Sequence, residues 1–296
     1  MNLSDRYRGA LLGLACGDAV GTAVEFQPRG SFSPLTDMIG GGPFRLPPGA
    51  WTDDTSMALC LATSLVECRG FDARNQMNHY LDWYENGYLS STGTCFDIGN
   101  TTRSALQRYR ETGEPFSGPT DPRSAGNGSL MRLAPVVLFF YPDHDLARHY
   151  AAESSRTTHG AAECLDACRL FGEMLCRALG GADKQAILLG HKVDIFRSEK
   201  IADIGRGAYF EKEKFLIRGS GYVVNSLEAA LWSFQSTYTF EAAILTAANL
   251  GDDADTTAAI CGQIAGAFYG ESEIPRHWLE KLVMKEEIAK LAEGLS

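Results

Sequence analysis

Helical spacing of apolar residues dominates this chain of 296 residues. Apolar side chains recur at intervals of three and four, which buries one face of an α-helix, and the alternation typical of β-strands is scarce. The pattern predicts helices over residues 5–19, 55–69, 72–86, 98–111, 129–140, 145–154, 160–180, 183–193, 225–235, 239–249, 256–269 and 275–293. We therefore expect an all-α fold whose function is carried by loops at helix ends.

The chain has no stretch with the composition of an interdomain linker. Its least regular stretches, residues 111–128 and 195–221, contain Gly, Pro and charged residues but lie within the helical pattern. A chain of this length with 45% hydrophobic residues can form one large core. The sequence predicts a single domain over residues 1–296.

Charge and hydropathy exclude two classes of partner. The formal net charge is −10, and residues 103–110 carry scattered arginines rather than a basic patch, so we expect no nucleic-acid partner. No stretch reaches the roughly 18 uninterrupted apolar residues of a membrane span. The apolar run over residues 10–16 is ended by Asp18 and is too short to be a signal peptide. We expect no membrane span and a cytoplasmic location.

The eight cysteines contain no C-x-x-C motif and lie mostly in apolar helical patterns. Cys164 and Cys168 share a helix face, but two thiols without a second pair are a weak zinc signal. We interpret the cysteines as buried thiols in a reducing compartment.

Two short stretches, WTDDT at residues 51–55 and GDDADT at residues 251–256, concentrate carboxylates at predicted helix starts. One interpretation is capping, because Asp and Thr accept hydrogen bonds from the free N–H groups of a first helical turn and acids there meet the positive end of the helix dipole. A cap needs only one or two acceptors, however, and neighbouring carboxylates repel one another unless a cation lies between them. The second interpretation is that the two stretches are halves of one metal site.

The residue types in these stretches suit hard divalent cations. Mg²⁺ and Mn²⁺ prefer oxygen ligands, and two ions held about 4 Å apart need roughly four to six carboxylates. The candidate metal ligands are Thr52, Asp53, Asp54, Asp253, Asp255 and Thr256. Glu25 stands between apolar neighbours in GTAVEF, where burying a carboxylate alone is costly, so it must be paired or lie near a metal.

Three further segments carry candidate substrate-binding residues. CFDIGNTT places Asp97 and Asn100 before a predicted helix, and AGNGSLMR contains a Gly-Asn-Gly turn. Free N–H groups of such a turn can bind phosphate, although the tripeptide is also an ordinary turn. His159 in TTHG is commonly a cap or a packed side chain, and Tyr222 is commonly a core aromatic.

Together these segments resemble the ADP-ribosylglycohydrolase family, and within it the dinitrogenase reductase activating glycohydrolase branch. The matching stretches occur in the family's order from about residue 6 to residue 282: GLACGDAVGTAVEF, GGGPFRLPPGAWTDDTSM, FDIGNT, GNGSLMR, TTHG, SGYVVNSLEAALW and GDDADTTAAICGQIAGAFYG. The resemblance implies an all-α, orthogonal multi-helix fold with a binuclear Mg²⁺ or Mn²⁺ cleft. It implies an enzyme that cleaves ADP-ribose from a modified side chain, which is arginine in that branch.

The resemblance also implies roles for individual residues. Asp97 matches a carboxylate that contacts the ribose and is needed for turnover, and Glu25 matches an acid close to the metals and the catalytic water. Either of them can move the proton that cleavage of the C1–N bond requires. The metal-binding motifs match Thr52, Asp53, Asp54, Asp253, Asp255 and Thr256, and the positions that hold ADP-ribose match Asn100, Gly126, Asn127, Gly128, Ser129, His159 and Tyr222.

One position departs from the family pattern. Asp252 stands where family members commonly have glycine. Its carboxylate can either tune the metal affinity or face solvent, and we expect it to face solvent.

Three functions are compatible with this sequence. The first is hydrolysis of ADP-ribosyl-arginine on a mono-ADP-ribosylated protein, either in nitrogenase regulation or as immunity against an ADP-ribosyltransferase toxin. The second is hydrolysis of another ADP-ribose linkage, to serine or an O-acetyl group, and the third is non-catalytic binding of ADP-ribose. The full set of adjacent carboxylates argues against the third. If a protein partner is occluded physically as well as demodified, the Pro- and Gly-bearing stretch 27–48 is the candidate segment.

Overall fold

The computed structural model describes residues 2–296, which are almost entirely helical. Within them no strand forms a sheet, and only isolated bridges join Gly41 with Leu46 and Gly126 with Tyr222. The expected all-α fold is confirmed. The α-helices are α1 (Leu3–Gly21), α2 (Asp53–Cys68), α3 (Ala73–Asn86), α4 (Asn100–Thr112), α5 (Ala134–Phe140), α6 (His144–Arg156), α7 (Ala162–Leu179), α8 (Lys184–Leu188), α9 (Glu199–Gly205), α10 (Val223–Gln235), α11 (Phe240–Ala248), α12 (Ala254–Tyr269), α13 (Arg276–Lys281) and α14 (Lys285–Gly294). Short 3-10 helices are η1 (Thr22–Val24), η2 (Pro122–Ser124), η3 (Val193–Ile195), η4 (Lys214–Leu216) and η5 (Glu271–Glu273).

Two of the expected helices are shorter than the apolar pattern predicts. The helix expected from residue 129 begins only at Ala134, because Pro135 lacks an N–H group and suits a first turn. The helix expected over 183–193 ends at Leu188, and the next residues cross to an irregular segment. In both cases the apolar pattern continues beyond the helix because the flanking segments are themselves partly buried.

The last expected helix is divided, and one helix was not expected. Residues 275–293 form α13 and α14, separated at Met284, whose φ of 55° is left-handed. Tertiary hydrogen bonds hold this break, since Val283 donates to the carbonyl of Gly49 and accepts from the Trp51 indole. The stretch expected to be irregular contains α9, whose first turn is capped by the Ser198 hydroxyl.

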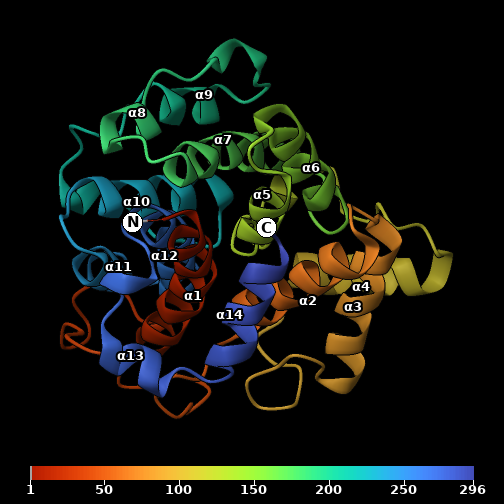
Figure 1. The fold of residues 1–296 in the computed structure, drawn as a ribbon, viewed down its shortest axis with the longest axis horizontal. Helices are drawn as coiled ribbons and strands as arrows, with labels where there is room; N and C mark the ends of the chain where they lie inside the picture. The colour runs from red at the N-terminus through yellow and green to blue at the C-terminus, as the bar shows by residue number, and fades with distance from the viewer. Residues whose placement is uncertain (1) are drawn as a thin grey trace.

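Helices α1 and α12 run antiparallel through the middle of the molecule, with α10 and α11 on one side and α2 and α14 on the other (Figure 1). Glycines at every fourth position of α1 face the α12 backbone. A β-carbon added to Gly13 would lie 2.4 Å from a carbonyl oxygen of α12, and one added to Gly17 would lie 2.1 Å from another. A β-carbon at Gly21 would lie 2.4 Å from the Cα of Asp255. Only glycine permits this approach, so the end of α1 is held against the first turn of α12.

One continuous cluster contains nearly all of the buried apolar side chains and extends from Tyr7 to Leu295. Within residues 2–296 no helix combines the length and the apolar character needed to cross a bilayer. All eight cysteines are unpaired thiols, and six of them are buried, as expected; Cys68 is exposed and Cys95 half-buried.

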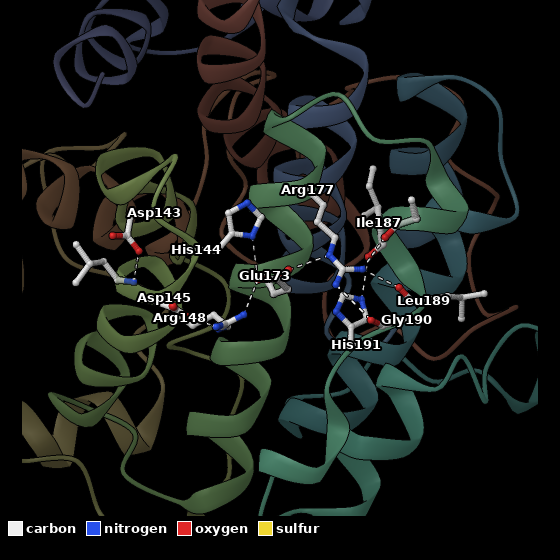
Figure 2. A network of polar contacts seen from close by, with 12 residues as sticks. Asp143, His144, Asp145, Arg148, Glu173, Arg177, Ile187, Leu189, Gly190 and His191 are labelled. Carbon is white, nitrogen blue, oxygen red and sulfur yellow. Dashed lines mark hydrogen bonds and ion pairs between the residues drawn. The ribbon is translucent and has the colours of Figure 1, made fainter.

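A polar network around Glu173 joins α6 to α7 (Figure 2). His144 and Arg148 of α6 contact its Oε2 atom at 3.1 Å and 3.0 Å, and Arg177 donates to its Oε1 atom at 2.9 Å. Arg177 also donates to the carbonyl of Leu189 at 2.7 Å, which attaches the segment after α8. Burial alone would raise the pKa of Glu173, but hydrogen bonds from Arg177 and His144 hold it below its usual value. This carboxylate is surrounded by basic side chains.

Candidate active site

A cavity of about 770 Å³ opens beside the junction of α1 and α12. Its walls are the segment after η1, the starts of α2, α4 and α12, the Gly-Asn-Gly turn and the segment before α10. The sequence-predicted site residues that line it are Glu25, Asp53, Asp97, Asn100, Gly126, Asn127, Gly128, His159, Asp253, Asp255 and Thr256. Side chains from positions more than 200 residues apart therefore face one space.

The two Thr-Asp stretches meet directly, although Thr52 and Asp54 lie behind the cavity wall. The Thr52 hydroxyl lies 3.3 Å from Oδ2 of Asp255, and the Thr256 hydroxyl lies 3.3 Å from Oδ2 of Asp54. The residues at the N-cap positions, Thr52 and Asp253, accept no capping hydrogen bond with their side chains. The capping interpretation therefore does not explain why these residues are present.

The carboxylates that line the cavity or lie behind its wall have no cationic partner among residues 2–296. We call them the acid cluster: Glu25, Asp53, Asp54, Asp97, Asp253 and Asp255. Oxygens of Glu25, Asp97 and Asp255 lie within 4.8 Å of one another. No ion pair joins any acid of the cluster to a basic side chain of residues 2–296. Burial, and then repulsion by neighbouring acids, raises the pKa of Glu25 to about 9 and that of Asp97 to about 7. The same causes raise the pKa values of Asp53, Asp54 and Asp255 well above their usual range, and burial raises that of Asp253.

Unpartnered oxygens show that a cation fits this cluster. Oε2 of Glu25 and the Oδ1 atoms of Asp54 and Asp255 are buried and accept no hydrogen bond from the described part of the chain. A buried acceptor without a donor costs about 1–3 kcal/mol, and more when it is charged. A hard divalent cation would satisfy such oxygens and reduce their repulsion, so the residues present fit a metal ion.

Asp18 supports the cluster from α1, although the sequence marks it only as a lone carboxylate within an apolar helix. It is fully buried and accepts hydrogen bonds from the N–H and hydroxyl of Thr52, both at 2.9 Å. It also accepts from the N–H and hydroxyl of Thr55 at 3.0 Å and 2.7 Å. Burial raises the pKa of Asp18 to about 6, and these hydrogen bonds oppose the rise. Asp18 therefore fixes the first turn of α2, which carries Asp53 and Asp54.

The Gly-Asn-Gly turn presents unused N–H groups in the wall of the same cavity. Within residues 2–296, the N–H groups of Gly128 and Ser129 have no hydrogen-bond partner, whereas that of Asn127 donates to Gly221 at 3.1 Å. The Asn127 side chain donates to Oδ2 of Asp253 at 2.7 Å and so ties the turn to the acid cluster. Successive free N–H groups of this kind form an anion-binding concavity.

His159 packs against this turn as a neutral imidazole. A β-carbon at Gly128 would lie 2.8 Å from its Cε1 atom, so only glycine fits there. Burial, and then the charge of Arg132, lower the pKa of His159 to about 3. Arg132 donates to the Thr158 hydroxyl at 2.7 Å, which leaves that hydroxyl to donate to Nδ1 of His159 at 2.8 Å. This arrangement favours the tautomer that carries its hydrogen on Nε2, on the side of the glycine turn.

Ser129 lies inside the fold rather than on the cavity wall. Its hydroxyl accepts from Ser155 of α6 at 2.8 Å and lies 3.6 Å from the Cys168 sulfur of α7. Its side chain therefore anchors the glycine turn, while its N–H group is free.

Tyr222 lines a neighbouring pocket of about 530 Å³, which shares Thr101, Gly126 and Gly221 with the main cavity. Its hydroxyl donates to Glu163 of α7 at 2.6 Å and accepts from Lys200 of α9 at 2.7 Å. The tyrosine ring is thus fixed by two helices at the far end of the glycine turn.

Two strained residues form another part of the cavity wall. Phe26 and Asp252 have left-handed φ values of 60° and 56°. Phe26 donates its N–H to the Asp252 carbonyl at 2.7 Å, and Asp252 donates to the Gln27 carbonyl at 2.8 Å. This conformation costs a residue with a β-carbon roughly 1–2 kcal/mol. Asp252 is exposed, as expected, and it also lines the cavity.

The stretch 27–48 is anchored to the body of the protein. Asn249 exchanges hydrogen bonds with the backbone of Leu35, and Asp37 contacts the side chains of Trp278 and Lys281. Of this stretch, Phe44 lines the cavity, where its ring packs 5.1 Å from that of Phe96.

Comparison with known proteins gives consistent matches along the whole chain. A family model described as ADP-ribosylglycohydrolase matches residues 1–296. The chain is 47% identical to ADP-ribosylarginine hydrolase Tri1 of Serratia proteamaculans, over 98% of this chain and 79% of that protein. It is 48% identical to Tri1 of Pseudomonas putida, over 98% of this chain and 78% of that protein.

A nitrogenase-related protein and a solved structure also match. Identity to the ADP-ribosyl-[dinitrogen reductase] glycohydrolase of Rhodospirillum rubrum is 33%, over 97% of this chain and 93% of that protein. A solved structure described as an ADP-ribosylglycohydrolase-related protein complex superposes with a TM-score of 0.87 at 45% identity, covering 99% of this chain and 98% of that one. The resemblance found in the sequence is therefore confirmed: this chain belongs to the ADP-ribosylglycohydrolase family.

Proposed function

We propose that this protein hydrolyses the N-glycosidic bond between ADP-ribose and arginine on a mono-ADP-ribosylated protein. The observation that carries the proposal is a single cavity in which unpaired carboxylates face an anion-binding turn. Carboxylates that hold a cation suit the ribose and its scissile bond, and free N–H groups suit the diphosphate. The two relatives named ADP-ribosylarginine hydrolase support arginine as the modified side chain.

The acid cluster is the proposed holder of two divalent cations, Mg²⁺ or Mn²⁺. The residues that would hold them are Thr52, Asp53, Asp54, Asp253, Asp255 and Thr256. When bound, such ions polarise water and orient substrate hydroxyls. The N–H and hydroxyl contacts of Asp18 support this role, because they fix the α2 ligands before any ion arrives.

The glycine turn and its neighbours are the proposed binding site for the ADP half. The N–H groups of Gly128 and Ser129, with Nε2–H of His159, would donate to the diphosphate, and Gly126 leaves room for it. Asn127 holds the turn against the acid cluster, and Asn100 lies at the first turn of α4 on the same cavity. The Tyr222 ring in the neighbouring pocket would stack on the adenine.

Glu25 and Asp97 are the proposed proton-transfer residues. Hydrolysis adds the OH of water to ribose C1, breaks the C1–N bond and places a proton on the departing guanidine nitrogen. A carboxylate that takes the water proton and returns it to that nitrogen balances the step. The proximity of Glu25 and Asp97 to Asp255 supports this role, because both acids then lie beside the proposed metal ligands.

The biological target is a protein modified either in nitrogenase regulation or by an ADP-ribosyltransferase toxin. The relatives of 47% and 48% identity are named for hydrolysis at arginine and not for nitrogenase, which supports an activity that is not restricted to nitrogenase regulation. We place the reaction in the cytoplasm, which is supported by eight unpaired cysteines.

The test is release of ADP-ribose from an arginine-ADP-ribosylated protein, with Mg²⁺ or Mn²⁺ and then with excess chelator. We expect metal-dependent release that falls at least about 100-fold in Asp97→Asn, because a general acid or base contributes roughly 10²–10⁴. Glu199→Gln changes an exposed residue of α9 and serves as the matched control. Undiminished release in chelator, or release only from serine-linked ADP-ribose, would contradict the proposal.

A further inference from the structure

The main cavity is joined to a second pocket. At Gly126 and Gly221 it continues into the pocket that contains Tyr222. Phe26 and Asp252 line the main cavity and take no part in that second pocket. The proposed substrate is linear, in the order adenine, diphosphate, ribose and arginine. If adenine lies at Tyr222 in the second pocket, the ribose and the arginine lie in the main cavity, which Phe26 and Asp252 line, so this inference rests on the proposed function.

Phe26 and Asp252 present side chains that the fold does not use. The Phe26 residue is 64% exposed despite its aromatic ring. The Asp252 carboxylate has no hydrogen bond or ion pair with another part of residues 2–296. Arg29 is close enough for the Asp252 charge to act on its pKa, but the Arg29 guanidinium donates to the carbonyls of Leu250, Lys214 and Ile217.

The backbone holds both residues in a conformation that glycine adopts more easily. Phe26 follows Glu25 and Asp252 precedes Asp253, and both of these acids belong to the acid cluster. Backbone hydrogen bonds from Phe26 to Asp252 and from Asp252 to Gln27 hold the two segments together. A bulky residue with positive φ is a genuine outlier, and such outliers persist where the surrounding structure determines them. Neither side chain is needed for the core, so both are available to a ligand.

We propose that Phe26 and Asp252 recognise the guanidinium group of the substrate arginine and thereby select arginine-linked over serine-linked ADP-ribose. A guanidinium is planar and cationic, so it stacks on an aromatic face and pairs with a carboxylate. A serine linkage offers neither the charge nor the planar donors. Both residues bind the leaving group and take no part in the proton transfer.

The test compares wild type with Asp252→Gly on ADP-ribose linked to arginine and to serine, at saturating Mn²⁺. Glycine suits the left-handed φ, so the variant removes the carboxylate without adding strain. We expect kcat/KM for the arginine substrate to fall about tenfold, as loss of one charged contact of roughly 1.4 kcal/mol implies. Activity on the serine substrate and the Kd for free ADP-ribose should change less than about twofold.

Further variants separate the alternatives. Phe26→Leu should lower kcat/KM for the arginine substrate about threefold, because a cation–π contact of modest size is lost. Tyr238→Ser is the control, since Tyr238 is 91% exposed and lines neither pocket, and it should lower kcat/KM for neither substrate. An unchanged arginine kcat/KM in Asp252→Gly would overturn the inference. A loss that appears at limiting Mn²⁺ and is absent at saturating Mn²⁺ would also overturn it, because the residue would then tune metal affinity. Wild type that fails on the arginine substrate would overturn the proposed function itself.

Discussion

Glu173 and Asp255 are both carboxylates held inside this fold, and they differ in what surrounds them. Glu173 joins α6 to α7 and contacts His144, Arg148 and Arg177 (Figure 2). Asp255 lies at the start of α12, where the nearest charged groups are other carboxylates, Glu25 and Asp54 among them. Its Oδ1 atom has no hydrogen-bond partner among residues 2–296.

The difference separates a charge cluster that the protein itself satisfies from one that it leaves unsatisfied. The charges around Glu173 are satisfied by the protein itself, and the pKa of this residue lies below its usual value. The charges around Asp255 are not satisfied by the protein, and burial and like charges raise its pKa. Buried carboxylates without cationic partners are costly, so the second cluster fits a cation from outside the chain.

The largest expected effect is on catalysis. Asp255→Ala should lower kcat for release of ADP-ribose by roughly 10³ or more, because a metal contributes several kcal/mol of stabilisation to the transition state and about 1.4 kcal/mol is a factor of ten. Glu173→Ala, read in the same assay at a temperature where both variants are folded, should keep kcat within about threefold of wild type. Comparable losses in the two variants would remove the distinction between the clusters.

The second effect is on stability without metal, and its sign should differ between the clusters. In chelator, Glu173→Gln should lower the free energy of unfolding by about 2 kcal/mol, because hydrogen bonds to a charged group are lost. Asp255→Asn should raise it by roughly 1 kcal/mol, because one repelling charge is removed. Urea unfolding measures both, and a loss of stability in Asp255→Asn would contradict the repulsion that we infer.

The smallest effect is a pH dependence of stability that is confined to the network around Glu173. The folded-state pKa of Glu173 lies below its unfolded value of about 4.3, so its stabilisation is present above that value and disappears as the pH falls through the folded pKa. The difference in unfolding free energy between wild type and Glu173→Gln should therefore shrink below about pH 4. A difference that stays constant from pH 7 to pH 3 would show that charge is not its cause.

Much of this fold could be predicted because the helical pattern is strong and local. The errors arise where tertiary contacts override it. Hydrogen bonds that Val283 makes with the Gly49 carbonyl and the Trp51 indole hold the break between α13 and α14 near Met284, which no local pattern indicates. The glycine spacing that brings α1 against α12 is visible in the sequence, but its meaning depends on the opposite helix.

The site residues of unusual type could be predicted from the sequence. The residues that hold them in place could not. The two Thr-Asp stretches concentrate charge, so their meeting in space could be inferred from ligand chemistry alone. Asp18 supports Thr52 and Thr55 from a different helix, and a single acid in an apolar helix gives no sign of that contact. Lys200, which fixes Tyr222, lies on a helix that the sequence pattern did not indicate.

The most direct test of the acid cluster as a metal site is a calorimetric titration of Mn²⁺ into metal-free protein, for wild type, Glu173→Gln and Asp255→Ala. The acid cluster predicts binding of about two ions per chain in wild type and in Glu173→Gln, and loss of at least one ion in Asp255→Ala. Absence of binding in wild type, or binding that Asp255→Ala leaves unchanged, would contradict a metal site at the junction of α1 and α12.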